Sequence, residues 1–519
     1  MIKNKLLIFS CVLAIVMMSF TIPSWAEVQT APQKVDAVLK AKGKVTQGQR
    51  KAAAKNFKAI TGAKAGVSFI TPAMDPGGIP HYFGPYANWA YSPLPKGAIA
   101  LITLTDGGTG YNNPLVTISD YYNTGSGAAA ASATADPLTG AITGITGGLG
   151  GTDYTAPVVT IVDDPALCGG AAQPECGAGA AATATIGGTL TGGIHKFIDK
   201  LPGLTPAGAN SLVQPSGDTQ YIPIAVADTA TYSGSDYYVI ALVDFYEKMH
   251  TDLPPSKHRG YVQLETPANI GVSKHIALKY ADTNAPIYYP GTTTQVIAVD
   301  NPHFMGPVIV ARGSALGVAG APGQPVPVRI KFYNLLPTGS GGNLFLPVDT
   351  TVMGSGEGPA PGEQYTENRA TVHLHGQNGI WISDGTPHQW ITPAGETTSY
   401  PRGVSVRNVP DMPDPGPGAM TLFYTNAQSA RLMFYHDHAY GITRLNVYAG
   451  EAAGYVITDQ VEQDMINGTN VSGVNPNALH VLPDIGVPMV IQDRTYVDAS
   501  TIATQDPTWN WGTTPPTPH

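Results

Sequence analysis

The chain has 519 residues, enough for more than one domain, and carries a net charge of −9 with only 13% charged side chains. This mild balance gives no indication of nucleic-acid binding. The 60 glycines and 45 prolines make up about a fifth of the chain, which is typical of a turn-rich all-β protein.

The first 26 residues have the three parts of a secretory signal peptide. Lys3 and Lys5 form the charged start, residues 6–20 the apolar core, and the triplet SWA at 24–26 the cleavage site. The apolar run is shorter than the about 20 residues that a membrane span needs. We expect cleavage after Ala26, export to the periplasm, outer surface or extracellular space, and no transmembrane segment in the mature chain.

Residues 27–65 are rich in lysine, arginine and alanine and poor in acids. They predict a basic lead-in, mobile, helical or disordered. It is either simply solvated or in contact with an anionic cell surface.

Residues 106–193 contain an internal repeat. GGTGYNNPLVTISD (107–120) recurs as GGTDYTAPVVTIVD (150–163), and GSGAAAASATA (125–135) is echoed by GAGAAATATI (177–186). Such a pattern predicts short strands joined by glycine turns. Ionisable side chains are scarce, which disfavours catalysis there. We interpret the segment as a β-rich insertion that serves partner contact or is a passive decoration.

The three cysteines are Cys11, inside the signal peptide, Cys168 and Cys176. Because export places the mature chain in an oxidising compartment, we expect Cys168 and Cys176 to form a disulfide. Two free thiols are the alternative.

Two His-X-His pairs are 63 residues apart, His373-Leu374-His375 and His436-Asp437-His438. Alternate residues of a strand share a face, so the two imidazoles of a pair would stand about 6.6 Å apart. Two such strands side by side can direct four ring nitrogens at one small volume. One pair could be incidental, but two pairs in strand-like runs predict a transition-metal centre. Imidazole alone does not select the metal.

The residues around these pairs resemble the first cupredoxin domain of bacterial multicopper oxidases. The matching stretches are KFYNLLPTG, LFLPVDTTVMG, TVHLHGQNGIWISDGTPHQWITPAGE, NVPDMPDPGPG and RLMFYHDHAYGITRLNVYAGEAAGYVI, between Lys331 and Asp459. The resemblance implies an all-β fold, a cupredoxin-like Greek-key β-sandwich. It also implies copper as cofactor, and a reducing substrate, phenol-like or a metal ion, that is oxidised while O2 is reduced to water.

The resemblance also implies roles for individual residues. His373 matches a type 2 copper ligand, and His375, His436 and His438 match type 3 ligands. Asp384 matches an acid that helps to deliver protons during O2 reduction, and its place before Gly385 is equally compatible with a turn residue. Asp437 alternates with the ligands and is expected to be structural.

The second half of such a copper centre is not recognisable in the chain. No cysteine is flanked by histidine, as a type 1 copper site requires, and no His-X-His follows His438. The last residues resemble the first strands of a second cupredoxin domain. We expect a truncated or split product, with the missing domains possibly on another chain. A non-catalytic exported copper-binding protein and a cell-surface interaction protein are the alternatives.

These expectations divide the chain into five parts. They are the signal peptide (1–26), the basic lead-in (27–65), the first cupredoxin domain (66–105 and 194–459), the repeat insertion (106–193), and a linker with an incomplete second cupredoxin domain (460–519).

Overall fold

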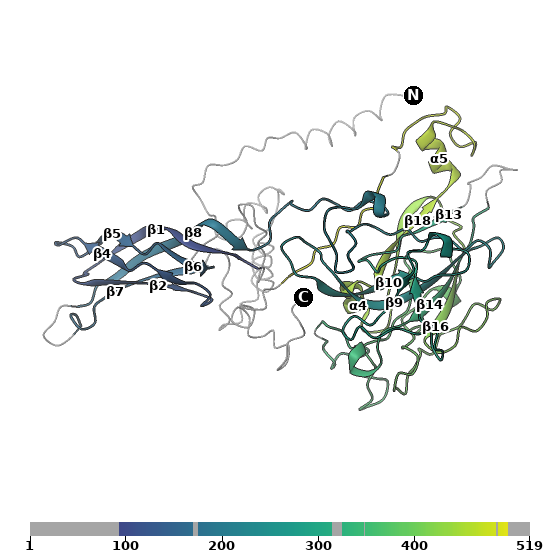
Figure 1. Ribbon diagram of the computed structural model, residues 1–519, viewed down its shortest axis with the longest axis horizontal. Coiled ribbons are helices and arrows are strands. Elements are labelled where there is room, and N and C mark those ends of the chain that lie inside the picture. The colour runs from purple at the N-terminus through teal and green to yellow at the C-terminus, as the bar shows by residue number, and fades with distance from the viewer. Residues whose placement is uncertain (1–92, 170–174, 314–323, 347, 484–485, 497–519) are drawn as a thin grey trace, which may run out of the picture. The chain divides into compact units, whose positions relative to one another are not determined.

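The computed structural model describes residues 93–169, 175–313, 324–346, 348–483 and 486–496 (Figure 1). The expected signal peptide, the basic lead-in and residues 497–519 lie outside this range. The described residues are mostly β, in one eight-stranded sheet, two four-stranded sheets and one two-stranded sheet. No helix among them is both long and apolar enough to cross a bilayer.

The eight-stranded sheet, hereafter the repeat sheet, covers residues 95–192 with the strand order β3-β6-β1-β8-β7-β2-β4-β5. Its strands are β1 (Pro95–Thr109), β2 (Pro114–Asp120), β3 (Ser126–Ala128), β4 (Ala131–Ala135), β5 (Ile142–Gly147), β6 (Gly150–Tyr154), β7 (Pro157–Asp163) and β8 (Ala178–Gly192). The expected boundary at residue 106 falls inside β1, which is paired with β8 from Pro95↔Gly192 to Thr109↔Ala178. The sheet therefore begins before the repeated sequence does.

The two copies of the repeat hold each other through one aspartate from each. The Asp120 carboxylate accepts hydrogen bonds from the backbone N–H groups of Thr155 and Ala156, both at 2.8 Å. The Asp163 carboxylate accepts from the N–H groups of residues 112–113, at 3.1 and 2.7 Å. The donors and acceptors of the two sets are related by the 43-residue offset, so the contact is reciprocal. We call these hydrogen bonds of Asp120 and Asp163 the clasp.

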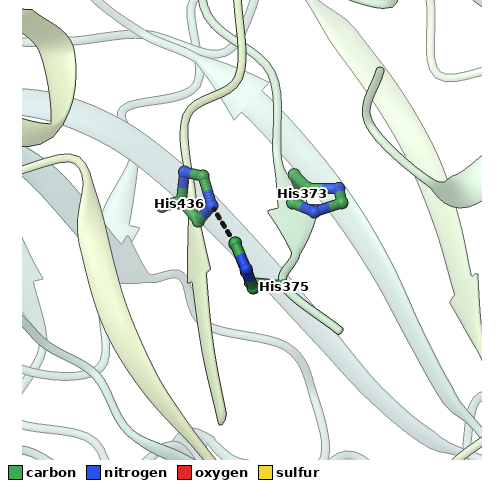
Figure 2. A group of neighbouring side chains, drawn as sticks. All are labelled: His373, His375 and His436. Carbon is green, nitrogen blue, oxygen red and sulfur yellow. Dashed lines mark hydrogen bonds between the residues drawn. The ribbon is translucent and has the colours of Figure 1, made fainter. Parts of the chain in front are cut away.

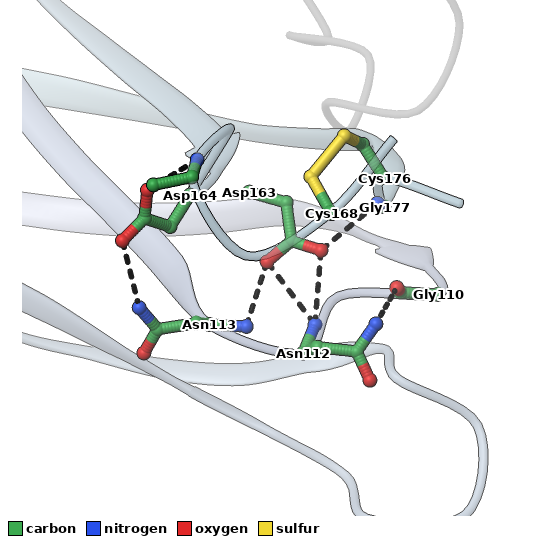
Figure 3. The surroundings of a disulfide bond; sticks show 9 residues. Gly110, Asn112, Asn113, Asp163, Asp164, Cys168, Cys176 and Gly177 are labelled. Carbon is green, nitrogen blue, oxygen red and sulfur yellow. Dashed lines mark hydrogen bonds between the residues drawn. A yellow bond between two sulfur atoms is a disulfide. The ribbon is translucent and has the colours of Figure 1, made fainter. Parts of the chain in front are cut away.

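The disulfide Cys168–Cys176 forms, as predicted, and lies beside this clasp (Figure 3). Gly177, the residue after Cys176, donates its N–H to the Asp163 carboxylate at 3.1 Å. The loop that lengthens the second copy is thus closed covalently and attached to the same acid.

The remaining sheets form a cupredoxin-like β-sandwich. One sheet has the order β10-β9-β14-β16, with β9 (Asp236–Glu247), β10 (Ser256–Gln263), β14 (Val328–Asn334) and β16 (Ala419–Tyr424). The other has the order β13-β18-β17-β15, with β13 (Ile309–Arg312), β15 (His373–Leu374), β17 (Arg431–His436) and β18 (Ala452–Thr458). Side chains from both sheets share one apolar core, including Ile240, Phe332 and Leu422 from the first and Leu374, Tyr435 and Ile457 from the second.

Short elements complete the sandwich. They are the strands β11 (Ile276–Ala277) and β12 (Ile297–Ala298), the 3-10 helices η2 (Pro206–Gly208), η3 (Ile270–Val272), η4 (Gly339–Gly342) and η5 (Trp381–Ser383), and the helices α4 (Thr443–Ala449) and α5 (Gln460–Asn467). Beyond α5, where a second cupredoxin domain was expected to begin, the described residues contain no strand.

Candidate metal centre

The two His-X-His pairs meet because β15 and β17 are neighbours in the second sheet of the sandwich. The strands are antiparallel, with His373 opposite His436 and Leu374 opposite Tyr435. The pairing continues one residue further, where the His375 N–H donates to the Phe434 carbonyl at 2.9 Å. Residues directly opposite in an antiparallel pair lie on the same face. The histidines therefore converge, as the sequence predicted (Figure 2).

Strand alternation separates these histidines from the core. Leu374 and Tyr435 are 1% and 0% exposed and belong to the shared apolar core. Because successive side chains point to opposite faces, His373 and His436 lie on the other side of the sheet. Burial of the apolar neighbours thus fixes which face carries the imidazoles.

The four rings form a compact group. The His373 ring centroid lies 5.6 Å from that of His375, 5.4 Å from that of His436 and 4.7 Å from that of His438. His436 and His438 are 5.7 Å apart. Ring nitrogens of His373, His375 and His436 lie within 4.8 Å of one another. A cluster of this size can hold metal ions between its members.

Backbone carbonyls set the orientation of two of the rings. Nδ1 of His373 lies 2.5 Å from the Asp384 carbonyl oxygen, and Nδ1 of His436 lies 2.6 Å from the Asp437 carbonyl oxygen. A carbonyl only accepts, so each Nδ1 carries the proton and each Nε2 keeps its lone pair. Metal-binding histidines are commonly held in this way.

The other two histidines have nitrogens that could bind a metal ion. His375 Nδ1 lies 3.1 Å from His436 Nε2. Because His436 carries its proton on Nδ1, His375 Nδ1 donates a hydrogen bond to His436 Nε2, and a bound metal ion would replace this contact. His438 Nδ1 is buried and has no hydrogen-bond partner among the described residues. An unsatisfied buried nitrogen beside three other imidazoles fits a metal-binding role.

Burial favours the neutral form of His436 and of His438. It is the largest cause that lowers the pKa of His436 to about 4, and neighbouring histidines lower it further, against the opposing hydrogen bond to the Asp437 carbonyl. Burial also lowers the pKa of His438, and the nearby His373 adds to the effect. Neutral imidazoles at neutral pH have the free lone pairs that a transition metal needs.

Asp384 approaches the centre mainly through its backbone. Its carboxylate Oδ1 lies 3.8 Å from His373 Nδ1 and its side chain is 41% exposed, whereas its carbonyl contacts that nitrogen directly. The next residue, Gly385, has φ +67°, and a Cβ there would stand 2.1 Å from the Val372 carbonyl oxygen. Asp384 thus occupies a turn that requires glycine, and its carboxylate is open to solvent beside the centre.

Asp437 points away from the centre, as strand alternation predicted. Its carboxylate is fully buried and accepts hydrogen bonds from the N–H groups of Thr371 and Ala439 and from the Asn446 amide, at 2.9, 3.0 and 3.0 Å. Burial raises its pKa to about 6, although these hydrogen bonds act in the opposite direction. Its role is to hold the chain between two ligands.

Phe434 is part of the centre, although its sequence position did not single it out. Its ring stacks on His375 at 4.8 Å and on His436 at 5.1 Å. It lies two residues before His436 on β17, so it shares that face. The alternation that located the histidines could also have located this aromatic wall.

Comparison with known proteins identifies relatives of part of the chain. It is 26% identical over 307 residues to a laccase from Bacillus stratosphericus and 24% identical over 304 residues to a laccase from Bacillus subtilis. Each match covers 58% of this chain and 38% of the laccase. A rice protein named multicopper oxidase LPR1 homolog 1 is 33% identical over 152 residues, which is 28% of this chain and 22% of that protein. No family model matches the chain.

Among solved structures, a laccase from Pediococcus acidilactici is 15% identical and covers 50% of this chain and 36% of its own, with a TM-score of 0.24. A multicopper oxidase from Campylobacter jejuni, described as a metallo-oxidase, is 12% identical and covers 50% and 32%, with a TM-score of 0.23. The chain spans less than half the length of the two Bacillus laccases.

Proposed function

About half of this chain is related to the bacterial multicopper oxidases, and we propose that it is the N-terminal part of an exported oxidase of this kind. In this proposal it supplies half of the ligands of a trinuclear copper cluster. His373 is the type 2 ligand, and His375, His436 and His438 are type 3 ligands. A reducing substrate, phenol-like or a metal ion, would be oxidised while O2 is reduced to water.

The convergence of four imidazoles carries this proposal. His373 and His436 lie on β15 and β17, and His375 and His438 lie just after these strands. Two have Nδ1 engaged by carbonyls and two present nitrogens without a carbonyl partner. The donor set is all nitrogen, which suits copper, and bound copper would supply the one-electron chemistry that links substrate to O2.

The protein's own residues position the ligands and control access. The turn at Asp384–Gly385 holds His373 through the Asp384 carbonyl, and Phe434 covers His375 and His436 from one side. The carboxylate of Asp384 is open to solvent and lies 3.8 Å from His373 Nδ1, which supports a role in passing protons from water toward the centre. In this proposal Asp384 is the proton-delivering residue.

Two further parts of the proposal concern where the protein is exported and what supplies the remaining copper ligands. The signal-like residues 1–26 direct export to the periplasm, outer surface or extracellular space. The remaining copper ligands come from further cupredoxin domains, on a longer form of this polypeptide or on another chain. The match to only 38% of each Bacillus laccase supports this part.

Copper X-ray absorption on the copper-loaded chain tests the centre. We expect imidazole scattering and no sulfur ligand, and no intense absorption near 600 nm, because the described cysteines are paired with each other. His436→Ala should remove most of the imidazole signal. An intense blue absorption from this chain alone would contradict the proposed ligand set.

Activity is tested by complementation. The chain alone should not turn over a phenolic dye with copper and O2. Co-expression with the C-terminal domains of a related laccase should give a complex that does, and His436→Ala should abolish the turnover. Robust turnover by the isolated chain would contradict the proposal that it carries only half of the copper ligands.

A further inference from the structure

A second group of potential metal ligands lies in the sandwich part of the chain, apart from the four histidines. Asp218, Asp300 and His303 each place one ligand atom within 4.8 Å of the others. Asp300 and His303 follow β12, and Asp218 lies in the loop region before β9. In the sequence His303 was one of several isolated histidines, so only the folded chain brings it to two carboxylates.

His303 is held in the tautomer that a metal ligand needs, with Nδ1 protonated and Nε2 unprotonated. It is 2% exposed, and its Nδ1 lies 3.1 Å from Oε1 of Glu247, whose other oxygen accepts the Phe304 N–H at 2.5 Å. A carboxylate partner keeps the proton on Nδ1 and leaves a lone pair on Nε2. That Nε2 is buried and has no hydrogen-bond partner among the described residues. A carboxylate-bound histidine with a free Nε2 is the arrangement that orients histidines toward metals.

The two carboxylates already surround a cation, the ammonium group of Lys274. Lys274 Nζ lies 2.9 Å from Oδ2 of Asp218 and 2.9 Å from Oδ1 of Asp300. The Tyr221 hydroxyl lies 2.5 Å from Asp300 Oδ1, and the Asn301 amide donates to Asp218 Oδ2 at 2.6 Å. This side of the cluster is therefore built to hold positive charge.

The ammonium group is a replaceable occupant. The Lys274 side chain is 32% exposed, so its flexible stem can carry the charge out to water while it stays protonated. It leaves behind two carboxylates that need a cation.

A cavity of about 160 Å³ adjoins the cluster. Lys274, Asp300, Asn301 and His303 line it together with apolar side chains such as Ile224 and Val262. A single water needs about 10–15 Å³ of such space, so an ion and its remaining water ligands have room.

We propose that Asp218, Asp300 and His303 form a second metal site, which takes one divalent ion of the zinc type and which the Lys274 ammonium fills when no metal is bound. One imidazole nitrogen with two carboxylate oxygens is a ligand set that zinc accepts, with water in the fourth position. The site shares no residue with the four-histidine centre and does not depend on the proposed oxidase function.

The test is zinc titration by calorimetry of the full chain carrying His373→Ala and His436→Ala, so that the first centre contributes little. We expect one zinc per chain. Lys274→Met in this background should tighten binding by about tenfold or more, because the competing ammonium is gone. Lys279→Met removes an exposed lysine from the same region and should leave the affinity unchanged. His303→Gln should abolish the binding, and zinc should raise the melting temperature only where His303 is present.

Absence of zinc binding in both the background protein and the Lys274→Met variant would overturn the proposal, leaving Lys274 as a structural ion pair only. Binding that His303→Gln does not weaken would also overturn it. Should Lys274→Met fail to fold, the comparison of the background protein with His303→Gln, both retaining Lys274, decides by itself. Zinc X-ray absorption should then show one imidazole among oxygen ligands, and a sulfur or multi-histidine environment would contradict the assignment.

Discussion

The repeat sheet and the sandwich use polar side chains in opposite ways. In the repeat sheet, the carboxylates of Asp120 and Asp163 accept hydrogen bonds from backbone N–H groups of the other copy. In the sandwich, backbone carbonyls engage Nδ1 of His373 and of His436, and His438 Nδ1 has no hydrogen-bond partner among the described residues. A polar group with all its partners inside the fold stabilises that fold, whereas one with a partner to spare is available to a ligand.

The apolar cores of the two regions also differ, in size. The repeat sheet has two small apolar clusters, centred on Tyr154 and Tyr111. The sandwich has a large shared core that fixes β15 beside β17. A rigid core positions ligands accurately, and a lightly packed sheet depends more on its hydrogen bonds. The comparison therefore assigns chemistry to the sandwich and self-contained structure to the repeat sheet.

The largest effect should come from a ligand histidine. His436→Ala removes the ring whose Nε2 faces His375. Loss of a residue that only hydrogen-bonds a metal ligand typically lowers metal affinity about 10- to 100-fold. Loss of a ligand itself should lower copper affinity by more than that. Competition with a copper chelator measures it. His480→Ala, an exposed histidine, is the matched control and should have no effect. Equal losses in both variants would mean that the centre is not where copper binds.

Acidification should remove the stabilising contribution of His436 before that of the acids in the repeat sheet. The pKa of His436 is lowered to about 4 from 6.5, so the unfolded chain binds the proton first, and this residue's contribution to the stability of the metal-free sandwich is lost as pH falls from 6.5 to 4. The loss from this residue is at most about 3 kcal/mol. Burial raises the pKa of Asp437 to about 6, which acts in the opposite direction over the same range.

The contribution of His436 is isolated by comparing urea unfolding of the metal-free wild type and His436→Gln from pH 7 to 4. In the repeat sheet, burial would raise the pKa of Asp163, but hydrogen bonds from Asn113, Gly177 and Asn112 lower it overall. Its stabilisation is present above 3.8 and is lost only below that pH. If the difference in the free energy of unfolding between wild type and His436→Gln does not change with pH, the assignment to His436 is refuted.

A smaller effect is expected from breaking the clasp. Asp120→Ala leaves the buried N–H groups of Thr155 and Ala156 without their acceptor, which should cost about 2 kcal/mol of repeat-sheet stability. Asp120→Asn keeps one acceptor oxygen and should lose less. Thermal melting followed by limited proteolysis locates the loss, and copper affinity should not change. A copper defect would show that the two regions are coupled.

The smallest effect on copper should come from the largest deletion. Pro95 and Gly192 are paired across β1 and β8, so removing residues 96–191 joins positions that are already adjacent. Chelator competition should give a copper affinity within about twofold of the wild type, because no described ligand contact crosses from the repeat sheet to the four histidines. A large loss in a variant that is still folded by circular dichroism would show that the repeat sheet supports the centre.

The sequence by itself determined the local patterns. His-X-His spacing places both rings of a pair on one strand face whatever the rest of the chain does, and the 43-residue offset reveals two equivalent copies. Both follow from period-2 strand geometry or from identity between segments, which need no knowledge of distant contacts. The structural role of Asp437 could be predicted from the same strand alternation, and the disulfide from the oxidising compartment that the signal-like residues 1–26 indicate.

Tertiary structure decided the pairings between distant residues. The register that sets His373 opposite His436 depends on the packing of Leu374 and Tyr435 in the shared core. The reciprocal clasp and the extension of the repeat sheet back to Pro95 depend on strand pairing, which composition does not reveal. Asp218, Asp300 and His303 come from segments up to 85 residues apart. Long-range convergence of this kind leaves no periodic signal in a single sequence, so only the folded chain could show it.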